Sequence, residues 1–283
     1  VTVGATENCE QGILDDCGQG PANSDNLNDL ANFSSRGPAT DGRLGVTLVA
    51  PGIHVTGANS DDSLYSGAGV CGRDPSTLLP GETASAKKYY PANQTDYTWS
   101  SGTSHSTPIV AGASALLYQY FTIHLGAAPS PALIRAALVA GADATTGGHL
   151  NDGTSDLIPS IPNVHSGWGR VNLANLVSGL RSQFVVDQTQ ILRANNATYQ
   201  ADIQVSDPSQ PLRIVLAWTD PAASLSAANA LVNDLDLTVS NGSATWLGNV
   251  FSNGASATGG VADRLNNLEA VSLPTPQTGV YHI

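Results

Sequence analysis

The chain has 283 residues, of which 41% are hydrophobic and only 12% charged, and its formal net charge is −12. This length is enough for about two domains, and the apolar content is enough to build their cores. The negative charge argues against nucleic acid or an anionic membrane surface as a partner, and no apolar run is long enough to cross a bilayer. The low share of charged residues agrees with a secreted, extracellular protein.

The N-terminal part of the chain predicts short strands separated by long loops. Residues 1–6 and 43–50 have the apolar content of strands, and residues 7–32 between them are polar and irregular. Residues 58–96 are rich in Gly, Ser, Asp and Pro without periodicity, which predicts a long excursion over the surface.

Cys9 and Cys17 lie in the first polar loop, close enough in sequence to bridge it. A Cys9–Cys17 disulfide is the prediction for a secreted chain, and two free thiols are the alternative. Cys71 has no obvious mate in the sequence, and nothing around it marks a reactive thiolate.

A helix with a serine in its first turn is predicted next. The stretch Gly102-Thr103-Ser104-His105-Ser106-Thr107-Pro108 is followed by an apolar run to Phe121, rich in small residues, which predicts a central helix packed in a layered core. Backbone N–H groups of a first turn are unpaired and carry the positive end of the helix dipole, so they stabilise an oxyanion. Ser104 is therefore the candidate nucleophile and its own N–H a candidate oxyanion donor. A plain N-cap is the alternative.

The rest of the chain changes from helical to strand-like patterns. Ser130 and Pro131 start a predicted helix over 132–140 that Gly141 is able to stop, and a short terminal helix is expected over 171–180. Beyond about residue 185, short alternating runs separated by Pro, Asn and Gly predict an antiparallel sandwich; they cover 200–205, 212–218, 234–239 and 270–273.

Three blocks occur in an order typical of one family. They are Phe33-Ser34-Ser35-Arg36-Gly37-Pro38, Val49-Ala50-Pro51-Gly52 and Gly-Thr-Ser-x-x-Thr-Pro-x-Val-Ala-Gly from Gly102 to Gly112. Together they resemble the subtilisin-like serine peptidases, the subtilases of peptidase family S8. Gly167-Trp168-Gly169-Arg170-Val171 resembles the end of the same catalytic domain. The remainder resembles the C-terminal domain of the oxidation-resistant alkaline bacterial subtilases.

The resemblance implies an α/β fold followed by an all-β domain. Residues 1–185 correspond to the C-terminal portion of a subtilisin-like catalytic domain, with a partial parallel sheet and its helices. Residues 186–283 correspond to a jelly-roll β-sandwich, similar to a P-domain, that breaks off within its last strand. We therefore expect a fragment of a longer peptidase, in which the first half of the parallel sheet precedes Val1.

The implied activity is hydrolysis of peptide bonds through an acyl-enzyme on Ser104. The family's aspartate in an Asp-Ser/Thr-Gly context and its histidine in a His-Gly-Thr context do not occur in this sequence, and the oxyanion asparagine belongs to a segment before Val1. His105 and Ser106 replace the usual methionine and alanine. Because adjacent helical side chains point about 100° apart, His105 is not expected to act as the base. The other histidines are scattered singly, so this chain alone is predicted to be inactive.

Two alternatives come from other classes of protein. One is a non-catalytic pseudo-peptidase or binding module, in which the β-sandwich docks a protein or a sugar. The other is a different serine hydrolase such as an esterase, although the usual Gly-x-Ser-x-Gly elbow is not present around Ser104. The expected partners are protein or peptide substrates, the chain being monomeric, with no nucleic acid and no membrane.

Oxygen-bearing side chains gather in two stretches of the β-rich part. Calcium takes about six to eight oxygen ligands from carboxylates, amides and carbonyls, and the resemblance implies calcium in this domain. We therefore predict a structural calcium site; turn formation by the same Asp and Asn residues is the alternative that fits equally. Its candidate ligands are Asp234, Asp236, Asp263, Asn267 and Glu269.

Overall fold

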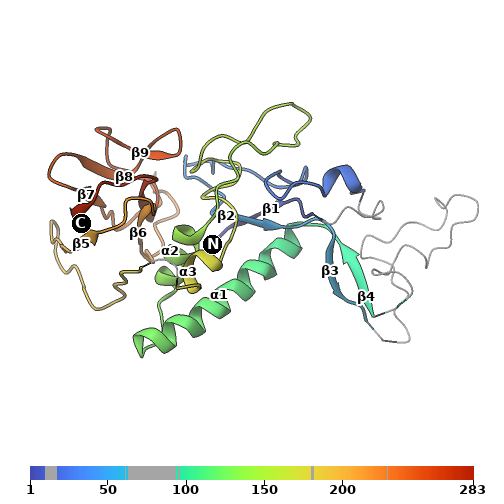
Figure 1. Cartoon of the computed structure of the whole chain (residues 1–283), viewed down its shortest axis with the longest axis horizontal. Coiled ribbons are helices and arrows are strands. Elements are labelled where there is room, and N and C mark those ends of the chain that lie inside the picture. The colour runs from blue at the N-terminus through green and yellow to red at the C-terminus, as the bar shows by residue number, and fades with distance from the viewer. Residues whose placement is uncertain (10–17, 61, 63–93, 95, 180–181, 228) are drawn as a thin grey trace, which may run out of the picture.

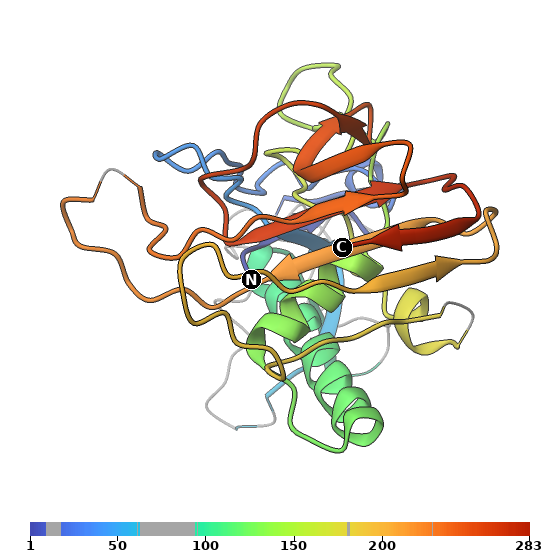
Figure 2. The same cartoon turned by 90° about the vertical axis from the view of Figure 1, so that its left-hand side faces the viewer.

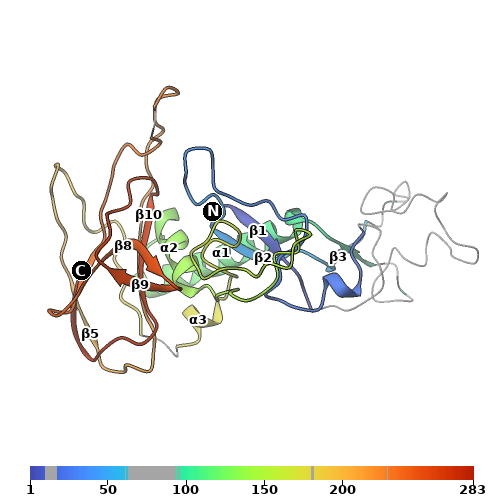
Figure 3. The same cartoon turned by 90° about the horizontal axis from the view of Figure 1, so that it is seen from above.

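The computed structural model describes residues 1–9, 18–60, 62, 94, 96–179, 182–227 and 229–283. In this part of the chain, helices and a pair of parallel strands form the middle of the molecule, with an all-β region at one end (Figure 1). A β-hairpin projects at the opposite end, and the view from above shows the same order of the three parts (Figure 3).

The two parallel strands are β1 (Val3–Thr6) and β2 (Leu48–Pro51), paired with Val3 opposite Leu48. Strand β1 confirms the prediction for residues 1–6. The second strand begins at Leu48 rather than at residue 43, because Gly45 has a φ of 84° that an extended strand does not accommodate. The carboxyl ends of both strands lie at the same edge of the pair.

The hairpin consists of β3 (Val55–Ala58) and β4 (Tyr97–Ser100), which pair antiparallel with Val55 opposite Ser100. The polar excursion predicted for residues 58–96 falls between these strands and lies almost entirely outside the described residues.

Helix α1 (Thr103–Leu125) confirms the predicted helix, with Gly102 as its N-cap and Gly126 ending it at a φ of 67°. One stripe of α1, which includes Val110 and Leu117, is buried against the two parallel strands. The sequence predicts a central helix packed in a layered core, but only this stripe of α1 is buried. The opposite face is exposed, since no other element covers it in the described structure; Ile109, Leu116 and Ile123 are exposed there.

Helix α2 (Pro131–Gly141) begins as predicted, with Ser130 Oγ accepting a hydrogen bond from the Leu133 N–H at 3.0 Å. Gly141 is the last helical residue rather than a left-handed stop, and the cap is Ala142. A Cβ on Gly141 would lie 2.7 Å from Leu176 Cγ, so the glycine allows α3 (Ala174–Val177) to approach closely. Helix α3 is shorter than the range 171–180 that the sequence predicts.

The C-terminal region contains two antiparallel sheets. A five-stranded sheet has the order β5-β11-β7-β8-β9, and β10 pairs with β6. Figure 2 shows these orange and red strands crossing in front of the green helices. The sequence patterns found several of the strands and missed β8 and β9; a jelly-roll topology stays a prediction. The bounds are β5 (Asp202–Val205), β6 (Leu212–Ala217), β7 (Thr238–Ser240), β8 (Thr245–Ser252), β9 (Ala255–Thr258), β10 (Leu268–Leu273) and β11 (Gly279–His282).

A single hydrophobic cluster joins the helices to the β-rich region. Residues of α1 and α2 pack with Leu268 and Ala270 of β10, and the rings of Trp168 and Phe251 meet edge to face at 5.6 Å. Arg213 of β6 donates to the carbonyl of Ala142 at 2.5 Å, just beyond the end of α2. The two regions therefore share a core, and the predicted boundary at residue 185 stays a prediction.

Candidate active site and acidic loop cluster

Ser104 lies at the carboxyl edge of the parallel strand pair, in the first turn of α1. The start of this helix is tied to the edge by two hydrogen bonds. The Gly102 N–H donates to the Gly52 carbonyl at 2.7 Å, and Ser106 Oγ donates to the Pro51 carbonyl at 3.2 Å. Because Gly52 directly follows β2, the sequence order of strand, glycine and helix places Ser104 at this edge.

Two glycines make this junction possible. A Cβ on Gly52 would lie 2.5 Å from Ser106 Oγ and 2.7 Å from the Ala5 Cβ. Gly102 has a φ of 155°, a conformation that side-chain-bearing residues rarely adopt. Gly52 therefore allows close packing beside Ser104, and Gly102 allows the change of chain direction before the helix.

The side chain of Ser104 is exposed, whereas Ser106 two residues later is fully buried. The first turn of α1 contains no acidic residue, so the helix itself places no carboxylate at the positive end of its dipole beside Ser104. The His105 N–H of this turn donates to the Gly102 carbonyl at 3.0 Å. An exposed hydroxyl at the positive end of a helix dipole is the arrangement that stabilises an oxyanion formed by attack on a carbonyl.

No described histidine hydrogen-bonds to Ser104. His105 is half-buried, and this burial lowers the pKa of its ring. His54 is 1% exposed; its ring stacks on Trp99 at 4.4 Å, and its Nε2 lies 3.2 Å from the Gln19 carbonyl. These contacts give His54 a packing role.

The arginines of the family blocks bind loop carbonyls and a carboxylate. Arg36 Nη1 lies 2.6 Å from Asp152 Oδ2, and its Nη2 donates to the Leu150 carbonyl. Arg170 donates to the carbonyl of Leu27 at 2.8 Å. Both side chains hold loops together.

Three carboxylates that the sequence did not predict as a group meet near the end of β1; Glu7 and Asp29 are buried and Asp25 is exposed. Carboxylate oxygens of Glu7, Asp25 and Asp29 come within 4.8 Å of one another. Glu7 is 1% exposed and accepts a hydrogen bond from Asn151 Nδ2 at 2.8 Å. Burial raises the pKa of Glu7 to about 7, and the charges of Asp29 and Asp25 add to this increase. The only sequence signal was a polar residue directly after a buried strand.

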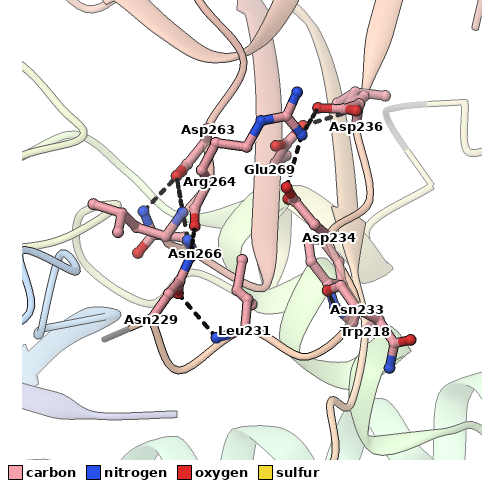
Figure 4. Close-up of polar contacts among 12 residues, drawn as sticks. Trp218, Asn229, Leu231, Asn233, Asp234, Asp236, Asp263, Arg264, Asn266 and Glu269 are labelled. Carbon is pink, nitrogen blue, oxygen red and sulfur yellow. Dashed lines mark hydrogen bonds and ion pairs between the residues drawn. The ribbon is translucent and has the colours of Figure 1, made fainter. Parts of the chain in front are cut away.

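Of the candidate calcium ligands, Asp234, Asp236 and Glu269 point toward the side chain of Arg264 (Figure 4). Arg264 Nη1 lies 2.7 Å from Asp234 Oδ2 and 2.9 Å from Asp236 Oδ1. Glu269 is 1% exposed; its Oε2 accepts from the Leu237 N–H at 2.6 Å, and its Oε1 is buried without a hydrogen-bond partner. Burial raises the pKa of Glu269 to about 7, and the nearby aspartates raise it further.

The other two candidate ligands, Asp263 and Asn267, form hydrogen bonds with residues outside this group. Asp263 accepts hydrogen bonds from the N–H of Leu265 at 2.8 Å and from Asn249 Nδ2 at 2.6 Å, and so fixes its own loop. Asn267 Oδ1 accepts from Arg135 Nη1 of α2 at 2.7 Å. The structure therefore does not bring the predicted ligands into one ion-binding group: among the described residues, no three of the carboxylates Asp234, Asp236, Asp263 and Glu269 have oxygens that all lie within 4.8 Å of one another.

The predicted disulfide involves Cys9, which is exposed, and Cys17, which lies outside the described residues. It stays a prediction. Within the described residues, no helix is long and apolar enough to cross a membrane.

The strand, glycine turn and helix around Ser104 present an exposed hydroxyl at the start of a helix, which is the arrangement that a serine hydrolase requires of its nucleophile. The family model Peptidase_S8, described as the subtilase family, matches residues 1–169. This is more than half of the chain, so the chain belongs to the subtilase family of serine peptidases. The resemblance of the sequence blocks is thereby confirmed.

Three curated proteins of Dictyostelium discoideum are similar to the chain. Their names are serine protease/ABC transporter B family protein tagD, tagA and tagB, and they are 26%, 24% and 28% identical over 87%, 89% and 88% of this chain. The chain spans only 15%, 14% and 15% of their lengths.

Proposed function

We propose that this chain carries the nucleophile of a secreted endopeptidase that cleaves proteins through an acyl-enzyme on Ser104. Exposure of Ser104 in the first turn of α1, at the positive end of the helix dipole, is the observation that supports this proposal. The carboxyl edge that holds it belongs to the part of the chain matched by the subtilase family.

In the proposed reaction, Ser104 Oγ attacks the carbonyl carbon of the scissile bond while its proton passes to a histidine base. The Ser104 N–H stabilises the resulting oxyanion. The C–N bond then breaks, the amine leaves with the proton, and water hydrolyses the acyl ester. The base and its orienting aspartate are proposed to come from polypeptide outside these residues, since no described histidine contacts Ser104.

The test compares the chain alone with the longest product of its gene. The chain alone is expected to give no turnover of a peptide substrate above background. In the longer protein, Ser104→Ala is expected to lower kcat by about 10⁶-fold. Ser114→Ala is the matched control, because Ser114 Oγ lies on the same helix and bonds only to the Val110 carbonyl. Normal turnover by Ser104→Ala would contradict the assignment.

A non-catalytic role is the second candidate, favoured by the lack of a described base beside Ser104. In that case the longest gene product binds its partner but does not turn over a peptide substrate, with or without the Ser104→Ala substitution. A missing aspartate and histidine upstream would support this alternative.

We also propose that the β-rich region, expected to be a jelly roll, holds a structural calcium ion. The buried Oε1 of Glu269, which lacks a hydrogen-bond partner, supports this. The charges of Asp234 and Asp236 act on Glu269, and their carboxylates have the oxygen chemistry that calcium prefers. The three side chains would have to move closer to share one ion, because their oxygens do not all lie within 4.8 Å of one another. The ion would add positive charge where carboxylates outnumber the single arginine. Asp263 and Asn267 would act by fixing the surrounding loops.

A further inference from the structure

His54 lies between the end of β2 and the start of β3, at the base of the hairpin whose second strand leads toward the start of α1 (Figure 1). The residue is polar, yet it is only 1% exposed. Its φ of 50° is in the left-handed region, which residues with a side chain rarely adopt. A conformation of this kind persists only where the surrounding contacts hold it, and such positions concentrate at functional sites.

The ring of His54 is held by two segments besides its own. It stacks on the Trp99 ring of β4, with the ring centroids 4.4 Å apart and the planes 10° from parallel. Trp99 is itself buried, and its Nε1 donates to Thr56 Oγ1 of β3 at 3.1 Å. The His54 Nε2 donates to the Gln19 carbonyl at 3.2 Å. The ring therefore fixes β4 just before the chain enters α1.

The backbone of the same turn holds the segment that precedes the nucleophile. The His54 N–H donates to Ser101 Oγ at 3.0 Å, and the Gly52 carbonyl accepts from the Gly102 N–H at 2.7 Å. Ile53, between the two, is fully buried, so the turn is anchored in the core. Two consecutive residues just before the nucleophile are thus tied to one rigid turn.

We propose that His54 is a positioning residue for Ser104. This inference rests on the proposed function, in which Ser104 attacks the scissile carbonyl. His54 acts through Trp99 and Ser101, which set the path of the chain into the first turn of α1. Loss of the ring would let this segment shift, and a shift of about 1 Å at a nucleophile slows attack by up to about 100-fold.

The test measures peptide hydrolysis by the longest product of the gene. His54→Asn removes the ring but keeps a residue that tolerates a positive φ. It is expected to lower kcat by about 10- to 100-fold and to leave KM within about twofold of the wild-type value, because substrate binding is not altered.

A count of reactive sites separates positioning from a simple loss of fold. Titration with a serine-directed organophosphonate gives the number of reactive serines, so that kcat is expressed per reactive site. A lower kcat per site is the expected result. Fewer reactive sites, each with the wild-type kcat, would mean that His54 only stabilises the fold, and would overturn the positioning role.

Tyr281→Leu is the matched control for lost stability. Tyr281 is also 1% exposed, and its ring stacks on Trp246 in a separate hydrophobic cluster of the β-rich region. This variant is expected to lower the melting temperature and to keep the wild-type kcat per reactive site. A loss of kcat per site equal to that of His54→Asn would show that destabilisation alone produces the effect, which also overturns the proposal.

Ser101→Ala provides the second variant if His54→Asn fails to fold. It removes only the hydroxyl that accepts the His54 N–H. A lower kcat per reactive site with KM unchanged is again expected, and a wild-type kcat in this variant would overturn the role of the turn.

The positioning role and the proposed function fail in different ways. If the wild-type protein shows neither turnover nor labelling of Ser104, or if Ser104→Ala keeps full turnover, the peptidase function is wrong and the role of His54 falls with it. If the wild type is active and His54→Asn keeps its kcat per reactive site, the function stands and only the role of His54 is overturned.

Discussion

The Gly102 N–H donates a hydrogen bond to the Gly52 carbonyl at 2.7 Å, and the Gly52 N–H in turn donates to the Thr6 carbonyl at 2.9 Å. One peptide segment thus connects the end of β1, the end of β2 and the start of α1. The position of Ser104 depends on this connection together with the hydrogen bond from Ser106 Oγ to the Pro51 carbonyl, because both hold the start of the helix at the edge of the strand pair.

Gly52→Ala is expected to destabilise the fold by about 2 kcal/mol or more, because the new methyl group would overlap buried atoms. It would lie 2.5 Å from Ser106 Oγ and 3.1 Å from the Gly102 carbonyl oxygen. Urea denaturation gives the free energy of unfolding. Gly57→Ala in β3 is the control, since a Cβ there meets no atom within 4 Å. Equal stability of the two variants would contradict this packing.

The helix start and its serine could be predicted because their signals are local. Glycine, a cap-compatible residue and a first-turn proline act within one turn, so the sequence before α1 determines where the helix begins. The exposed face of α1 could not be predicted, since burial depends on which other elements are present. An apolar run gives the same pattern whether one face or two are covered.

The partners of the acidic side chains could not be predicted from the sequence either. Carboxylates of Asp234 and Asp236 are neighbours in sequence, yet the structure pairs them with Arg264 from a distant loop and not with Asp263 beside it. Glu7 meets Asp25 and Asp29 because the loop after β1 returns to the strand. Contacts of this kind form only when the chain folds, so no periodic pattern in the sequence predicts them.

The raised pKa of Glu7 predicts that the stability of the fold depends on pH. Its pKa in the folded chain is about 7, above the ordinary 4.5, so the folded state holds a proton that the unfolded state has released. The stabilising effect is complete below about pH 4.5 and is lost as the pH rises through about 7. Glu7→Gln, which imitates the protonated form, is expected to remove up to about 3 kcal/mol of this dependence. Parallel stability curves for both proteins between these pH values would count against it.

The two hydrogen bonds of the Ser130 side chain predict an energetic coupling between the start of α2 and Asp187. Its hydroxyl accepts from the Leu133 N–H at 3.0 Å and donates to Asp187 Oδ1 at 2.6 Å. Ser130→Ala loses the cap and is expected to cost about 1–2 kcal/mol of stability. A double-mutant cycle with Asp187→Asn measures the second contact. A coupling energy of zero would mean that the hydroxyl acts only as a helix cap.

Calcium removal distinguishes true ligands from residues that only shape the loops. A chelator is expected to lower the melting temperature of the chain, because an ion bound only to the folded state stabilises it by mass action. Asp236→Asn is expected to abolish this difference, since it removes a charge from the cluster. Asn267→Ala is expected to keep it, because Asn267 Oδ1 binds Arg135 instead. Differential scanning calorimetry of the three proteins with calcium and with chelator gives the comparison. Loss of the calcium effect in Asn267→Ala, with retention in Asp236→Asn, would place the ion at a different set of oxygens.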